Sequence, residues 1–267
     1  MKKLDKYLAA YTISLQSVLQ HRASLFMDRF GGLAYITALY FFWDALLKGQ
    51  DNFMGYSRAQ MLSYVLAMNF LRSFVFTGRG WELVHEISSG RLSNYLLRPV
   101  SYLGYSLALD FAQKTVHAVA AVIEIGALIW VLKAPLYLPG DPATWALFAV
   151  ALCLSSLLFF MLEFMVSSLA FWTSESGGPL FFLQLFMQFA AGAFFPIDVL
   201  PLWIQKALAW TPFPYLVFGP ISLYLERTSH AEAYGMFGVQ AAWLVLFFVV
   251  LRTSWQRGLQ NYAAEGG

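Results

Sequence analysis

Charged residues and cysteine are both scarce in this sequence. Only 12% of the 267 residues are charged and 59% are hydrophobic, whereas a soluble domain carries about 25% charge. So few charges cannot cover a water-facing surface, which excludes the soluble class and indicates an integral membrane protein. The single cysteine, Cys153, excludes an internal disulfide and a Cys-based metal site. A net charge of +2 without a run of Lys and Arg argues against a nucleic-acid partner.

Sequence motifs for catalysis are missing as well. No Lys follows a Gly, so the chain has no Walker A loop, and any ATP would have to be hydrolysed by a separate chain. The patterns HExxH and GxSxG do not occur, and the 4 histidines are scattered. We therefore expect neither a catalytic site nor a metal site, and a membrane-embedded enzyme is disfavoured.

What the sequence does contain is a series of apolar segments. A helix rises about 1.5 Å per residue, so about 20 apolar residues cross a hydrocarbon core of about 30 Å. The pattern predicts an all-α integral membrane protein with a single transmembrane domain over 1–267. Its six transmembrane helices are expected at residues 25–47, 59–77, 104–132, 144–172, 178–197 and 236–252. Residues 1–24 have apolar positions at helical spacing and basic ends, which predicts an interfacial helix.

Basic residues predict the orientation of these spans. With the N-terminus inside, ten of the 17 Lys and Arg residues fall on the inner side and five on the outer side. Such an excess places both termini in the cytoplasm. The polar segment 78–99 is then cytoplasmic too, and Gly90 divides it into two amphipathic pieces. Its spacing alone leaves two roles open, namely transmission of movement from a soluble partner and passive anchoring at the membrane surface.

Residues 192–222 lie between the fifth and sixth predicted spans and are broken by prolines into pieces of one to two turns. Such pieces are too short to cross the membrane, and broken backbone at membrane depth must be covered by protein or line a cavity. We predict re-entrant helices in the outer leaflet. A lipid-facing loop without a function is the alternative.

Ionisable residues in the third predicted span lie close to one helical stripe, and they are Asp110, Lys114, His117 and Glu124. Charged groups at membrane depth are costly unless they are paired or hydrated, so this stripe should face protein. Asp110 and Lys114 are interpreted as an internal ion pair. His117, Glu124 and Glu163 of the fourth span are the candidates for a translocation path, with Arg72 as a partner for Glu163.

Three motifs follow one another along the chain: GRLSNYLLRP after the second span, GAFFPIDVLP after the fifth, and then TPFPY. With the number and direction of the spans, they resemble the type-two class of ABC export permeases, six-span bacterial subunits that export drugs, lipids or glycans. The resemblance covers nearly the whole chain. It implies a bacterial inner membrane, a second permease subunit (identical or related), and cytoplasmic ATPase subunits that bind ATP and Mg²⁺.

The resemblance also implies roles for segments of this chain. Segment 78–99 is expected to be a coupling helix that docks into the ATPase, and its candidate contacts are Glu86, Gly90, Arg91, Leu92 and Arg98. Segment 192–222 is expected to close the outer mouth, and its candidate gate residues are Phe195, Pro196, Pro201, Pro212 and Pro214. The buried acids favour a hydrophobic or cationic amphiphilic substrate, with lipid, glycan or peptide as alternatives. A secondary carrier or channel that works without ATP is the alternative function.

Overall fold

The computed structural model describes residues 3–49, 52–173 and 177–265. These residues form helices and one short antiparallel hairpin, β1 (Asn52–Phe53) with β2 (Tyr56–Ser57). In chain order the helices are α1 (Lys3–Gln20), α2 (Arg22–Leu46), α3 (Arg58–Phe74), α4 (Gly80–Ser88), α5 (Ser93–Leu96), α6 (Tyr102–Leu132), α7 (Pro142–Ser167), η1 (Ser168–Phe171), α8 (Gly177–Ala190), η2 (Ile197–Val199), α9 (Leu202–Ala209), η3 (Phe213–Tyr215), α10 (Phe218–Tyr224) and α11 (His230–Glu265).

Three of the described helices are long and apolar enough to cross a membrane, at Tyr102–Leu132, Pro142–Phe171 and His230–Tyr262. Helix α8 is also apolar but has only 14 residues, which is about 21 Å of helix. Helices α2 and α3 coincide with the first two predicted spans; α2 carries four charged residues, and α3 has only 17 residues. Each predicted span therefore contains a helix, and the crossing of all six stays a prediction.

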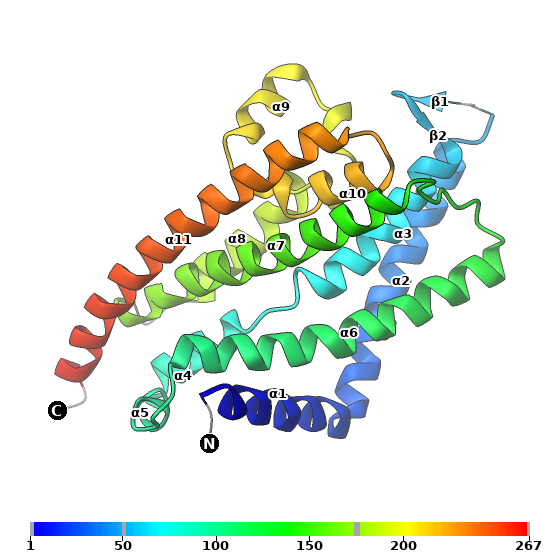
Figure 1. Cartoon of the computed structure of the whole chain (residues 1–267). Helices are drawn as coiled ribbons and strands as arrows, with labels where there is room; N and C mark the ends of the chain where they lie inside the picture. Colours follow the sequence, from blue (N-terminus) through cyan, green and yellow to red (C-terminus); the bar gives the residue numbers. More distant parts are fainter. Residues whose placement is uncertain (1–2, 50–51, 174–176, 266–267) are drawn as a thin grey trace.

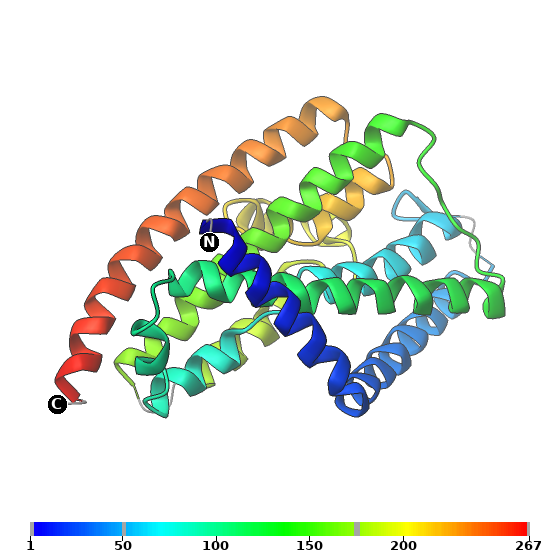
Figure 2. The same cartoon turned by 60° about the horizontal axis from the view of Figure 1, so that its bottom comes forward.

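The molecule has two ends, and different elements gather at each. Both chain termini, α4 and α5 lie at one end, whereas the β1–β2 hairpin and α9 lie at the other (Figure 1). Helix α11 packs along α7, and α1 packs against α6, which it crosses (Figure 2). The buried core comes mainly from α3 and α7. Helix α6 packs against α3, and its Asp110 and Lys114 are fully buried, so they face protein as the sequence predicts.

Local capping explains where several helices begin. Ser57 and Gln60 form a reciprocal capping box at the start of α3. Ser101 caps α6, and Asp141 caps α7 with a proline in its first turn. Gly90 has φ of +74°, which lets the chain turn sharply between α4 and α5. The division of segment 78–99 at this glycine is thus confirmed.

Proline also shapes the segment between α8 and α11 as expected, because it forms only short pieces, η2, α9, η3 and α10. Helix α8 ends at Ala190, seven residues before the predicted end of the fifth span. Helix α9 has no buried residue, and Leu202, Trp203 and Trp210 are largely exposed. That apolar surface is typical of a helix lying at a membrane interface.

Candidate functional site

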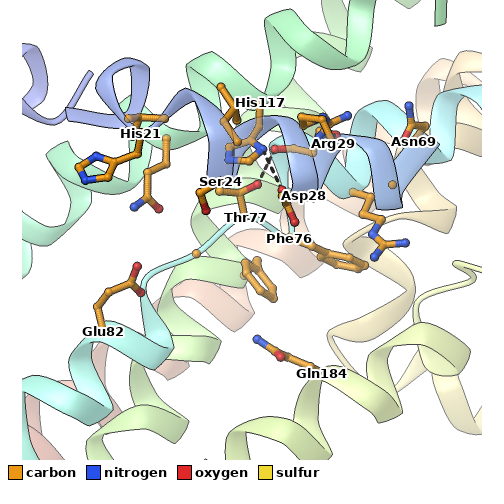
Figure 3. A pocket seen from close by; sticks show the side chains of 18 of the residues that line it. His21, Ser24, Asp28, Arg29, Asn69, Phe76, Thr77, Glu82, His117 and Gln184 are labelled. Atoms are coloured by element: carbon orange, nitrogen blue, oxygen red, sulfur yellow. Dashed lines mark hydrogen bonds and ion pairs between the residues drawn. The ribbon is translucent and has the colours of Figure 1, made fainter. Parts of the chain in front are cut away.

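A polar cavity of about 760 Å³ opens between α2, α3, α6 and α8, next to the first turn of α4 (Figure 3). The rings of Phe76 and Phe159 form part of its wall, with their centroids 5.3 Å apart. Its amide and hydroxyl groups come from Ser17, Ser24, Asn69, Ser73, Thr77, Gln113, Gln184 and Gln188. In the described ranges, no group of three or more His, Cys, Asp or Glu residues could hold a metal ion.

Two carboxylates are accessible in this cavity. Asp28 on α2 has a side chain that is 68% exposed, and Nδ1 of His117 lies 3.7 Å from its carboxylate. Figure 3 shows these two side chains facing each other, with Glu82 of α4 at the opposite side of the cavity. The predicted path residue His117 therefore does line the cavity, and Asp28 was not predicted because it lies close to the expected inner end of the first span.

Glu124 has a different environment from the one predicted. Both of its carboxylate oxygens accept hydrogen bonds from Arg29 of α2, and Asn69 donates a further bond of 3.2 Å. Another nitrogen of Arg29 donates to the Ser73 hydroxyl at 2.8 Å. The Arg29 and Glu124 side chains are only 14% and 12% exposed. Glu124 therefore lies behind the cavity wall as the counter-ion of Arg29, one of the ten basic residues counted on the predicted inner side.

The predicted ion pair between Asp110 and Lys114 is present, with an N–O distance of 2.7 Å. Both side chains are fully buried, and Lys114 also donates to the Ser156 hydroxyl on α7 at 2.9 Å. The predicted stripe thus divides between two neighbours. Lys114, paired with Asp110, contacts α7, whereas His117 and Glu124 contact α2.

Glu163 is buried where α4, α7 and α8 meet. It accepts hydrogen bonds from the Gly80 backbone N–H and from Gln184, the latter at 3.5 Å. A Cβ atom on Gly78 would overlap the carboxylate, and one on Gly80 would lie 2.6 Å from Cγ of Glu163. The side chain therefore fills space left by two glycines and is not part of the cavity lining.

The predicted pairing of Arg72 with Glu163 is wrong. The Arg72 guanidinium lies 4.8 Å from the centre of the Tyr35 ring and lines the cavity from α3. A cation above an aromatic face is stabilised without a carboxylate partner. Nothing in the sequence spacing indicates this choice of partner, because Tyr35 is on a different helix.

Segment 78–99 has an inward and an outward face. Glu86 is only 6% exposed, pairs with Arg79 at 3.3 Å and accepts a hydrogen bond from the Tyr102 hydroxyl of α6. Leu92 is fully buried. The expectation that these two residues contact an ATPase is corrected accordingly, because both attach the segment to the rest of the chain. Gly90, Arg91 and Arg98 are exposed.

At the other end of the molecule, a charged cluster joins three separate segments. The Tyr56 hydroxyl donates to Asp198 at 2.9 Å, and Arg227 pairs with the same carboxylate at 3.1 Å. The Arg227 guanidinium also lies 3.8 Å from the Tyr56 ring centre. This cluster holds the hairpin, η2 and the turn before α11 together. Of the predicted gate residues, Pro196, Pro212 and Pro214 are buried, Phe195 is half-buried and Pro201 is exposed.

A second contact at this end involves Tyr137 and Glu226. The Tyr137 hydroxyl donates to the Glu226 carboxylate at 2.5 Å. This bond raises the pKa of Tyr137 to about 12 and lowers the pKa of Glu226 below its ordinary value. The contact joins the loop between α6 and α7 to the turn that follows α10.

The comparison with known families assigns the chain. A family model described as ABC-2 family transporter protein matches residues 33–266, which include every described element from the middle of α2 onward. Among curated proteins, none matches the chain. Permeases of the matched family are membrane components of transporters, generally lack an ATPase site of their own, and work with an ABC ATPase subunit. The chain belongs to the ABC-2 family and is a multi-pass permease of ABC-2 type.

Proposed function

We propose that this chain is the permease subunit of an ATP-driven exporter in a bacterial inner membrane. It forms a dimer with itself or with a related permease, and two cytoplasmic ATPase subunits bind ATP and Mg²⁺. The family assignment supports the permease role and the ATPase partnership. The excess of basic residues on one side supports six spans with both termini in the cytoplasm.

The observation that supports the substrate class best is the combination of groups in the polar cavity. Asp28 and Glu82 offer carboxylates, while Phe76 and Phe159 offer aromatic surface. Of the two arginines in the lining, Arg29 is neutralised by Glu124 and Arg72 stacks on the Tyr35 ring, so the two carboxylates outnumber the one arginine that lacks a carboxylate partner. Carboxylates and aromatic rings together bind organic cations by ion pairing and cation–π contact. We infer that the cavity accepts a cationic amphiphile from the cytoplasm.

The coupling role of segment 78–99 is assigned to its outward face. Arg91 and Arg98 are exposed and can pair with acidic groups of an ATPase, whereas Glu86 and Leu92 hold the segment in place. Segment 192–222 closes the outer mouth in this proposal. The cluster of Tyr56, Asp198 and Arg227 supports such a role, because it fastens that segment to the hairpin.

Transport by the complex tests the proposal. The permease and its co-purified ATPase are reconstituted in vesicles, and ATP-dependent movement of the cationic dye ethidium is measured. Asp28→Asn should raise KM for ethidium about tenfold, because a charge-assisted contact contributes about 1.5–3 kcal/mol. Asp44→Asn is the matched control, since Asp44 lies at the far end of α2, outside the cavity, in an exposed pair with Arg58.

Two results would contradict the proposal in different ways. Equal KM values for Asp28→Asn and the unmodified protein would exclude the cavity carboxylate from recognition of the cation. Ethidium movement by the permease alone, driven by an ion gradient and without a bound ATPase, would establish a secondary carrier instead.

A further inference from the structure

A second crevice, of about 300 Å³, lies between the start of α6 and the last part of α11 and shares no residue with the polar cavity. Its floor is aromatic. The rings of Tyr102 and Trp255 are stacked with centroids 5.3 Å apart, and Phe164 lies 5.8 Å from Trp255. Phe248 and Leu251 extend this apolar surface along α11 toward the middle of the membrane. A floor of packed rings is rigid, so the crevice is preformed.

The mouth of this crevice is positively charged. Arg252 lines it, is exposed, and lies at the inner end of the last predicted span. Among the residues that the structure describes, no carboxylate is within ion-pair distance of Arg252. Lys6 lies on the same side, since its Nζ donates to the Pro99 carbonyl at 3.1 Å, two residues before Ser101 at the mouth. The N-terminus of α6 adds the positive end of a helix dipole.

We propose that this crevice is a binding site for an anionic phospholipid of the inner leaflet. One acyl chain lies along Phe248 and Leu251, and the phosphate pairs with Arg252. Basic pockets between transmembrane helices on the cytoplasmic side bind anionic head groups, and an apolar crevice below such a pocket matches the length of a lipid. The site rests on the proposed orientation, in which α6 and α11 cross the membrane with this end in the cytoplasm, but it is independent of the substrate and of the ATPase.

Native mass spectrometry of the purified permease tests the site. The protein is incubated with phosphatidylglycerol or phosphatidylcholine, and the fraction that retains lipid is measured at increasing lipid concentration. Arg252→Gln should weaken phosphatidylglycerol binding about fivefold, the size expected for one basic residue at a membrane surface. Phosphatidylcholine binding should weaken less, because its choline group offsets the charge of the phosphate. Arg257→Gln is the matched control, because Arg257 is exposed on α11 and is not part of the crevice.

Phe248→Ala supplies a second readout that does not depend on charge. It shortens the apolar wall, so both lipids should be retained less. Equal binding of the two lipids by the unmodified protein, or equal losses in Arg252→Gln and Arg257→Gln, would overturn the proposal, because only unselective surface lipid would then be present. A change in the dimer fraction with no retained lipid would also overturn it and assign the crevice to a protein interface.

Discussion

Neutralising Glu124 should destabilise the permease, and the structure indicates by how much. Removing one member of a buried ion pair costs about 3–5 kcal/mol, because the other charge is left without compensation. Arg29 keeps its hydrogen bond to Ser73 and borders the polar cavity, so Glu124→Gln belongs at the lower end, about 3 kcal/mol. Arg29→Gln should cost a similar amount. The double substitution removes both charges and should cost only about 1 kcal/mol, since two amides can bond to each other.

Equilibrium unfolding in mixed detergent micelles, followed for the three variants, gives the coupling energy of this pair. A coupling above about 2 kcal/mol is expected for residues in direct contact. Additive and small losses, below about 0.5 kcal/mol each, would refute the reasoning, because the pair would then behave like an exposed one. If Glu124→Gln instead abolished transport and left stability unchanged, Glu124 would act on the substrate, as the sequence first indicated.

Three further predictions follow from other contacts. Gly78→Ala should cost about 1–3 kcal/mol of stability through overlap with Glu163. In the Glu163→Ala background the same substitution should cost much less in the same unfolding assay. Additive losses in the double variant would contradict this. Arg91→Glu should weaken co-purification with the ATPase. The control Lys206→Glu, on α9 at the other end of the molecule, should not weaken it. Tyr137→Phe should lower Tm at neutral pH. That difference should vanish as the pH falls through the lowered pKa of Glu226, because the protonated carboxyl no longer favours this bond.

Much of the fold could be predicted because membrane helices follow from local sequence. Length and hydropathy locate α6, α7 and α11, and proline at several positions explains why only short helices occur between α8 and α11. Gly90 marks the break between α4 and α5 for another local reason, because glycine readily adopts the positive φ that this turn requires. The burial of Glu86, a candidate ATPase contact, does not follow from such local signals. A hydrophobic pattern counts Glu86 as polar and outward, although Arg79 and Tyr102 satisfy it in the interior.

The polar contacts could be predicted only within one helix. The Asp110–Lys114 pair is four residues apart on α6, so its spacing is sufficient. Arg29 and Glu124 are 95 residues apart, and their pairing depends on how α2 packs against α6. The position of Arg29 was the available signal for a buried partner. It lies seven positions inside a helix that begins at Arg22, and a charged residue at such depth needs a buried partner. Counting Arg29 only for orientation discarded that signal.

The two ends of α4 explain how a partner at segment 78–99 can act on the cavity. Glu163 and Gln184 hold the first turn of α4 to α7 and α8, while Glu86 holds its last turn to α6. A rigid displacement of α4 must therefore either break these buried bonds or move α6, α7 and α8 with it. Breaking the bonds is costly, because each unsatisfied group costs about 1–3 kcal/mol. Each of these helices supplies a wall residue of the cavity, His117 from α6, Phe159 from α7 and Gln184 from α8. In the proposed coupling, moving the helices together keeps the bonds intact, so force applied at the exposed face of the segment would shift these wall residues relative to α2 and α3, which supply the rest of the lining.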